Sequence, residues 1–239
     1  MSPNPVDFLN HVKAEGYHPR SDKHSNALAE AIMKDLFTYC PLIKLKGLNG
    51  EIVYDINFDI FGGNDKWNVD LVIGTAPLGM HFVQQEYIIR HRPASVQIAV
   101  EIKAVMTEHH KAVKNRKRDL EAHHAHVHKY NQNTIAGGVF VLNGSESFKS
   151  PLRPEITVHR RASELIEHCI NEMRSIESSG GIIGRPGLDA KAAVCVDCDN
   201  VNLSNTHYIT IRPSPQIGDP IYYDSFIQTI CYLYMARFR

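Results

Sequence analysis

The chain has 239 residues, and its 43% hydrophobic and 22% charged content is ordinary for a globular protein. Its 26 lysines and arginines balance its 26 aspartates and glutamates, so it lacks the net positive charge that marks many nucleic-acid binders. The five cysteines form no regular framework, and no apolar run is long enough to span a bilayer. We therefore expect a cytoplasmic protein without a membrane segment, whose core needs no disulfides.

The two signs of charge lie in separate blocks of the chain. Residues 51–70 hold five acidic side chains and a single lysine, whereas residues 111–118 hold five cations and no acid. A neutral total that is built from such blocks still produces strong local fields.

The first half of the chain predicts two helices followed by three strands. Residues 6–15 form a short helix, and apolar residues recur every four positions in a helix from about 21 to 38. EIVYDINFDI (51–60) alternates with one apolar face, and the turn FGGND joins it to a second strand at 67–74, so the two form a hairpin. VQIAVEIKA (96–104) is the third strand.

The second half predicts further helices and strands in one continuous domain, 1–239. A helix with Thr107 as its N-cap runs to about residue 130, and a buried strand follows at 134–143. Next come a strand at 156–159, a helix at 161–176, strands at 192–198 and 207–212, and an aromatic helix at 222–238. We expect an α/β fold with a mixed sheet, because no repeat or flexible linker divides the chain.

Glu101 and Lys103 interrupt the apolar third strand. They are two residues apart and therefore project from the same face of the strand. Burying two ionisable groups is costly unless they are paired or used in chemistry. Two explanations are open: a structural salt bridge at a sheet edge, or a catalytic site.

The order of elements from 25 to 143 is helix, strand, strand, strand, helix, strand, with Asp70 in the second strand and Glu101-Ile102-Lys103 in the third. This arrangement resembles the PD-(D/E)xK nuclease superfamily, which includes many restriction endonucleases. Val69 stands where the motif's name has proline, and the 30 residues between Asp70 and Glu101 make a long spacing. The resemblance implies a restriction endonuclease-like core of order αβββαβ at about 21–145, with a C-terminal extension at about 146–239.

The resemblance also implies roles for individual residues. Asp70 and Glu101 are expected to bind Mg²⁺, for which Mn²⁺ substitutes, because hard cations prefer carboxylate oxygens. Lys103 is expected to hold the attacking water and to stabilise the negative charge that develops. Glu30, on the first core helix, joins the metal site in part of this superfamily. Its alternative role is a solvated pair with Lys34 at i,i+4 spacing.

We therefore expect a Mg²⁺-dependent DNA endonuclease of type II restriction-like character that acts on double-stranded DNA. A repair or mobile-element nuclease of the same fold, and a catalytically silent DNA- or protein-binding domain, are the alternatives. Phosphate contacts are expected from the basic helix, whose cations are Lys111, Lys114, Arg116, Lys117 and Arg118. In that helix the run HHAHVH also places Glu121, His124 and His128 on one face, as a zinc site would need, although histidine-rich helices are more often surface than metal sites.

Cleavage of both strands by one site per chain implies a homodimer, because two-fold protein symmetry matches a palindromic duplex. The aromatic helix 222–238 is the expected interface, unless it covers the sheet as core. The proline-rich loop 212–220 is expected to face the DNA.

Overall fold

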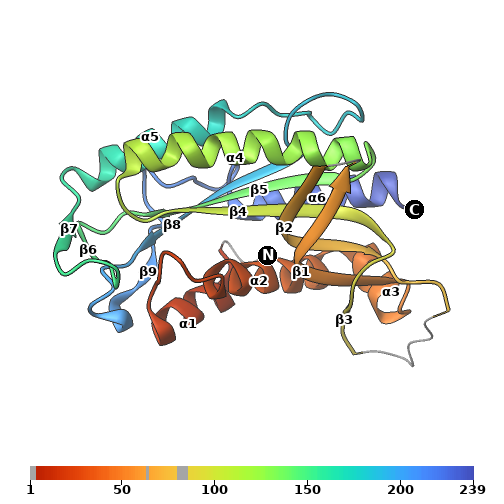
Figure 1. Ribbon diagram of the computed structural model, residues 1–239, viewed down its shortest axis with the longest axis horizontal. Helices are drawn as coiled ribbons and strands as arrows, with labels where there is room; N and C mark the ends of the chain where they lie inside the picture. The colour runs from red at the N-terminus through yellow and green to blue at the C-terminus, as the bar shows by residue number, and fades with distance from the viewer. Residues whose placement is uncertain (1–3, 63–64, 80–85) are drawn as a thin grey trace.

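The computed structural model describes residues 4–62, 65–79 and 86–239 (Figure 1). The helices are α1 (Val6–Glu15), α2 (Lys23–Tyr39), α3 (Pro41–Leu48), α4 (His109–Tyr130), α5 (Ala162–Ser175) and α6 (Tyr223–Arg237), with a 3₁₀ turn at Leu203–Asn205. The strands are β1 (Ile52–Gly62), β2 (Asp65–Thr75), β3 (Ile89–Arg90), β4 (Ser95–Val105), β5 (Ile135–Asn143), β6 (Ser147–Lys149), β7 (Ile156–Val158), β8 (Ala190–Asp197) and β9 (His207–Tyr208).

Within the described residues, seven strands form one mixed sheet in the order β3-β1-β2-β4-β5-β8-β9. The strands β1, β2 and β4 pair antiparallel, whereas β4, β5 and β8 pair parallel. The strands β6 and β7 form a separate hairpin. The α/β class with a mixed sheet is confirmed. In the same described ranges, no helix combines the length and apolarity that crossing a bilayer requires.

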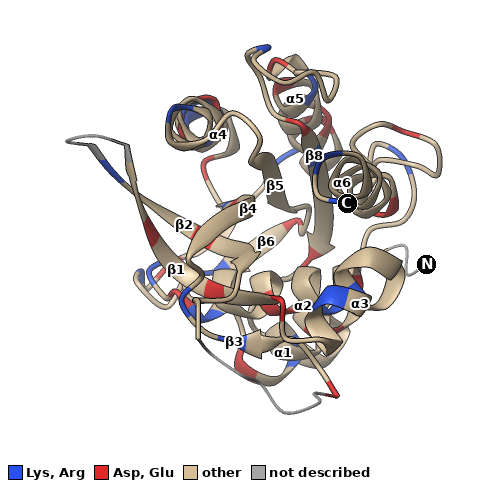
Figure 2. Cartoon of the chain, turned by 90° about the vertical axis from the view of Figure 1, so that its right-hand side faces the viewer, with Lys and Arg blue, Asp and Glu red and all other residues tan. Residues whose placement is uncertain are grey.

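Helices cover both faces of the large sheet, as the view along its strands shows (Figure 2). The helices α4 and α5 lie on one face, and α2, α3 and α6 lie on the other, with α1 packed against α2. Each face therefore has its own apolar core.

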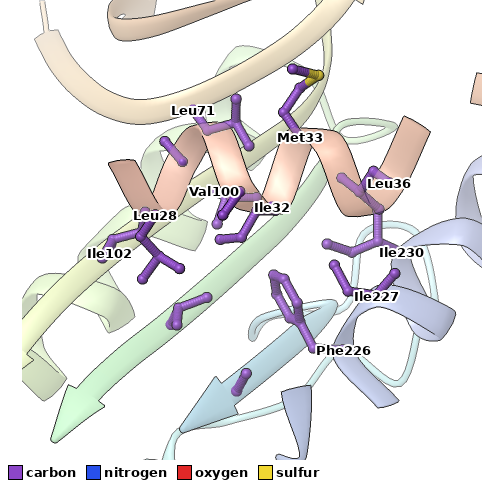
Figure 3. Packing of buried hydrophobic residues seen from close by; sticks show 14 of the residues in the cluster. Leu28, Ile32, Met33, Leu36, Leu71, Val100, Ile102, Phe226, Ile227 and Ile230 are labelled. Carbon is purple, nitrogen blue, oxygen red and sulfur yellow. The ribbon is translucent and has the colours of Figure 1, made fainter. Parts of the chain in front are cut away.

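The core under α2 follows from the four-residue spacing of its apolar side chains. Leu28, Ile32 and Leu36 are fully buried and lie over the sheet, where Figure 3 shows them beside Val100 and Phe226. Complete burial of one such side chain stabilises a fold by about 1.5–3 kcal/mol. This packing fixes the orientation of α2 over β2 and β4.

Helix α6 closes the same core from the far end of the chain. The ring of Phe226 lies so close to Gly137 of β5 that a Cβ there would come within 3.2 Å of it. This helix was expected to be either a dimer interface or part of the core, and the structure therefore assigns most of it to the core. Tyr223 and Tyr234 are also buried, and Tyr232, at 69% exposure, is an aromatic residue left at the surface.

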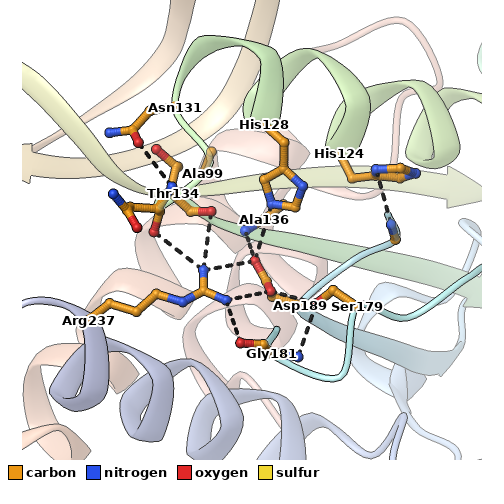
Figure 4. Close-up of polar contacts among 12 residues, drawn as sticks. Ala99, His124, His128, Asn131, Thr134, Ala136, Ser179, Gly181, Asp189 and Arg237 are labelled. Atoms are coloured by element: carbon orange, nitrogen blue, oxygen red, sulfur yellow. Dashed lines mark hydrogen bonds and ion pairs between the residues drawn. The ribbon is translucent and has the colours of Figure 1, made fainter. Parts of the chain in front are cut away.

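A buried ion pair fastens the end of α6 to the sheet (Figure 4). Arg237 donates from both terminal nitrogens to Asp189, at 2.8 and 3.2 Å, and Ser179 donates to the same carboxylate at 2.6 Å. Although burial raises the pKa of Asp189, the nearby His128 and the hydrogen bonds from Arg237 and Ser179 outweigh it and hold the pKa well below its usual range. The segment 146–239 thus shares its sheet and core with the first half of the chain.

Several predicted elements agree with the structure, and four details differ. The helix 6–15 and the hairpin of β1 with β2 are confirmed, although the tip of the predicted turn, 63–64, lies outside the described residues. Residues 41–48, for which no helix was predicted, form α3, because proline fits the first turn of a helix. The strand predicted at 207–212 ends at Tyr208.

The start of α4 also differs from the prediction. Glu108, not Thr107, is the residue before the helix, and it has a left-handed conformation with φ of +50°. Its side chain makes no capping hydrogen bond to the helix. Thr107 was therefore the wrong cap.

The predicted alternation of β1 is wrong at Asn57. This residue has φ of +55°, and the apolar side chains change sides there. Ile52, Tyr54 and Ile56 belong to the core under α2, whereas Phe58 and Ile60 belong to the core under α4. The change of face lies directly opposite Asp70, because the flanking pairs are Ile56 with Leu71 and Phe58 with Val69.

The substitution Phe226→Ala tests the role of α6 as core. We expect it to lower the free energy of unfolding by about 3–5 kcal/mol, because it leaves a cavity between α6 and β5. Tyr232→Ala, on the exposed side of the same helix, should change it by no more than about 0.5 kcal/mol. Urea unfolding of both variants measures the difference, and equal effects would contradict the assignment of α6 to the core.

Candidate active site

The strands β2 and β4 separate at Asp70. Their pairing includes Leu71 with Val100, and no pair follows toward Asp70 in the described register. Past this point, the Asp70 carboxylate takes the place of a main-chain acceptor, because its Oδ2 accepts the N–H of Ile102 at 2.7 Å. The gap between two neighbouring strands therefore contains a carboxylate that the sheet itself holds in place.

Glu101 and Lys103 project from β4 next to this gap. Glu101 is 3% exposed, and its Oε1 accepts a hydrogen bond from the ammonium group of Lys103. Its other oxygen, Oε2, is buried and has no hydrogen-bond partner among the described residues. One carboxylate oxygen is thus paired with a cation, and the other remains available as a ligand.

The three charged residues line one hollow of about 610 Å³. Its other lining residues are Asp22, Asn57, Trp67, Asn68 and Asp119. A second hollow of about 370 Å³ shares Asp22, Asp70 and Lys103 with it and extends to the α1–α2 turn and to Arg116 of α4. Asp70 and Lys103 therefore stand where the two hollows meet.

Burial controls the electrostatics of the site. It raises the pKa of Glu101 to about 7, with a further contribution from the charge of Asp70, and Lys103 opposes both. Burial also raises the pKa of Asp70, against the hydrogen bond from Ile102 N–H and the charge of Lys103. The ionised form of two such carboxylates is stabilised when a cation binds between them.

Glu30 is not part of this arrangement. Its Oε1 lies 3.8 Å from the Arg90 guanidinium at the β3 end of the sheet, and it lines neither hollow. Lys34, the alternative partner expected for Glu30, pairs with Asp7 instead, and its ammonium lies 2.6 Å from that carboxylate. The structure therefore places Asp70, Glu101 and Lys103 together and Glu30 apart from them.

The predicted phosphate-binding cations divide into three groups. Arg116 lines the second hollow and contacts Asp119 at 3.2 Å. Lys117 turns away from the site and donates to Glu172 and Ser175 of α5, at 3.2 and 2.7 Å. The others are exposed on α4 and line neither of the two hollows: Lys111, Lys114 and Arg118.

Four further residues of the site were not singled out in the sequence. Asp22 precedes α2, Asp119 lies within the basic helix, Trp67 opens the second strand, and His123 belongs to the histidine run. The first two had a signal, since they are carboxylates. Their convergence depends on the angle between α2, α4 and the sheet, which the sequence pattern does not give.

The side chains of the histidine run make contacts other than those of a zinc site. His124 accepts from Gly187 N–H at 3.3 Å, and His128 lies 3.4 Å from Asp189. No group of three or more His, Cys, Asp or Glu side chains suited to a metal occurs within the described ranges. His123 and His126 instead meet Trp67 on another side of the helix.

Comparisons of this chain with protein-family models, with curated proteins and with solved structures found no match.

The raised pKa of Glu101 predicts a pH-dependent effect of Glu101→Gln on stability. Between the ordinary pKa of 4.5 and about 7, the folded protein holds a proton that the unfolded chain has lost. The wild type therefore loses stability as the pH rises through this window, and the glutamine variant does not. Without metal, the free energy of unfolding of the variant relative to wild type should rise by on the order of 3 kcal/mol from pH 4 to pH 8.

Urea unfolding in a chelating buffer measures this difference. Glu155→Gln is the control, because that carboxylate is exposed and its replacement should change stability little. A relative stability of Glu101→Gln that is flat or falls across the window would contradict the burial of an ionisable Glu101.

Proposed function

We propose that this protein is a Mg²⁺-dependent DNA endonuclease that hydrolyses phosphodiester bonds, of type II restriction-like character. The convergence of Asp70, Glu101 and Lys103 where β2 and β4 separate carries the proposal. The succession α2, β1, β2, β4, α4, β5 around this point supports the likeness to the PD-(D/E)xK superfamily. The short elements α3 and β3 are additions to that succession.

The donor atoms fit Mg²⁺. Asp70 and Glu101 offer hard carboxylate oxygens, and Oε2 of Glu101 is buried without a partner among the described residues. Mg²⁺ is commonly held by only one or two carboxylates and keeps several waters, so a third protein ligand is not required. When bound, the ion supplies Lewis-acid chemistry that offsets phosphate charge and acidifies water. Mn²⁺ should substitute, because it takes the same ligands.

Lys103 has the donors that the hydrolysis needs. Its ammonium group carries three N–H bonds, of which one is directed to Oε1 of Glu101. The other two are available to hold the attacking water and to stabilise the charge that develops on the phosphate oxygens. Its pairing with Glu101 keeps the ammonium group on the side of the strand that faces the hollow.

Arg116 extends the site along the substrate backbone. It lines the second hollow, which shares Asp70 and Lys103 with the first, so it is placed for a phosphate next to the scissile one. The exposed Lys111, Lys114 and Arg118 add sequence-independent contacts farther along α4, whereas Lys117 is occupied by α5.

A homodimer on double-stranded DNA is part of the proposal, since each chain contributes one site. Most of α6 is core, so its part in an interface is limited to exposed side chains such as Tyr232. The loop 212–220 lines a hollow together with α5 and is absent from the lining of the two hollows at Asp70, so it meets the DNA only beyond the catalytic site.

Lys103→Ala tests the catalytic assignment. We expect DNA cleavage with Mg²⁺ to fall by at least 10²- to 10³-fold, about the loss seen when a transition-state donor is removed. DNA affinity, measured with Ca²⁺ in place of Mg²⁺, should change only slightly. Lys117→Ala is the matched control. The Lys117 ammonium is hydrogen bonded to Glu172 and Ser175 of α5, so this variant should cut at close to the wild-type rate.

The product pattern from plasmid or phage DNA also separates the readings of this site. Discrete fragments are expected from a restriction-like enzyme, and a smear would favour a structure-selective nuclease. DNA left intact by the wild type under Mg²⁺ and Mn²⁺ would refute the proposal and leave a silent binding domain. Cleavage by Lys103→Ala at the wild-type rate would reduce Lys103 to a structural partner of Glu101.

Metal binding should depend on pH for the same reason that Glu101 resists ionisation. A carboxylate must lose its proton before it binds Mg²⁺, and the pKa of Glu101 is about 7. We expect Mg²⁺ to raise the melting temperature at pH 8 and to have little effect at pH 5.5. Thermal unfolding with and without Mg²⁺ measures this, and an equal shift at both pH values would exclude Glu101 as a ligand.

A further inference from the structure

The carboxylate of Glu101 rests against a fully buried histidine. His123 of α4 is 0% exposed, and its Nδ1 lies 3.9 Å from Oε2 of Glu101. Its two ring nitrogens have one hydrogen-bond partner each: Nε2 lies 3.3 Å from the carbonyl oxygen of Ala99, and Nδ1 lies 3.3 Å from Nε1 of Trp67.

These two partners determine the tautomer of His123. A carbonyl oxygen only accepts, so the Nε2 that faces Ala99 carries the hydrogen. An indole nitrogen only donates, so the Nδ1 that faces Trp67 has none. The ring is therefore neutral, with its Nδ1 lone pair occupied by the Trp67 N–H.

The consequence for Glu101 is an oxygen without a donor. Because Nδ1 of His123 has no hydrogen, it cannot donate to Oε2 of Glu101, although the two atoms are 3.9 Å apart. No other described residue donates to Oε2 either. An unpaired buried acceptor is unfavourable in the protein alone and becomes favourable once a cation uses it.

Trp67 is the residue that keeps His123 in this state. It is the single tryptophan of the chain, it lines the same hollow as Glu101, and its indole stacks on the ring of His126 with centroids 4.5 Å apart. The histidine run therefore has a structural explanation: His123 and His126 hold one indole at the edge of the site.

We infer that Trp67 and His123 are positioning residues for metal binding, which keep Oε2 of Glu101 free of hydrogen bonds so that it can bind a divalent cation. The inference rests on the proposed function only for the identity of the site. Without the indole N–H, the hydrogen of His123 can move from Nε2 to Nδ1, so that the ring gives up its bond to Ala99 for a charge-assisted hydrogen bond to the Glu101 carboxylate, which occupies Oε2.

Trp67→Phe tests this inference, because it keeps an aromatic ring against His126 and removes the N–H donor. We expect the dissociation constant for Mn²⁺, measured by calorimetry without DNA at pH 8, to rise about tenfold or more, as loss of an outer-shell partner does. At saturating Mn²⁺, cleavage should return close to the wild-type rate.

Tyr234→Phe is the matched control. It also removes one buried donor to a side chain of β4, since the Tyr234 hydroxyl donates to Gln97 at 2.7 Å on the face covered by α6. It should leave Mn²⁺ affinity unchanged. His123→Gln, whose amide can donate to Ala99 and accept from Trp67, is a second variant and should keep near wild-type affinity.

The outcomes separate this inference from the proposed function. If wild type binds Mn²⁺ at a site sensitive to Glu101→Gln, and Trp67→Phe weakens it while Tyr234→Phe does not, the inference holds even if no DNA is cut. Equal Mn²⁺ affinity of Trp67→Phe and wild type would overturn it. An equal loss in Tyr234→Phe, or no Glu101-dependent Mn²⁺ binding in wild type, would overturn it as well.

Discussion

The separation of β2 from β4 is the constraint on which the site depends. A sheet that continued its pairing past Leu71 and Val100 would use the Ile102 N–H in its own ladder. Here the Asp70 carboxylate accepts that N–H instead, so a charged group is held inside the plane of the sheet at 2.7 Å from the main chain. Asn57, with its positive φ on the neighbouring strand, lies at the same level of the hairpin, where the apolar side chains of β1 change faces.

The rest of the fold offsets the cost of this arrangement. Glu101 is buried with one unpaired oxygen, and burial raises the pKa of both carboxylates, so the metal-free site destabilises the protein. Apolar cores on the two faces of the sheet hold β4 in place despite this cost. Arg237 and Asp189 fasten the last helix to the sheet, with both partners buried and hydrogen bonded. A cation bound to Oε2 of Glu101 would relieve this part of the cost.

The sequence was sufficient for most of the longer elements and for the three central residues, because these depend on local patterns. The period of two in β4 places Glu101 and Lys103 on one face, and the period of about four in α2 predicts its buried stripe. Glu30 had the same local signal, yet its position along α2 brings it to Arg90 rather than to Asp70. His123 and Trp67 are far apart in the chain, and only the packing of α4 on the hairpin brings them together. Such contacts depend on the angles between elements, which no local period encodes.

The central claim is that Asp70 and Glu101 together bind one divalent cation. The most direct measurement is a crystal structure of the protein with Mn²⁺, in which anomalous scattering locates the ion. We expect one strong peak within about 2.3 Å of a carboxylate oxygen of Asp70 and of Oε2 of Glu101, with water completing the shell. A peak elsewhere, or an ion held by only one of these two carboxylates, would contradict this account.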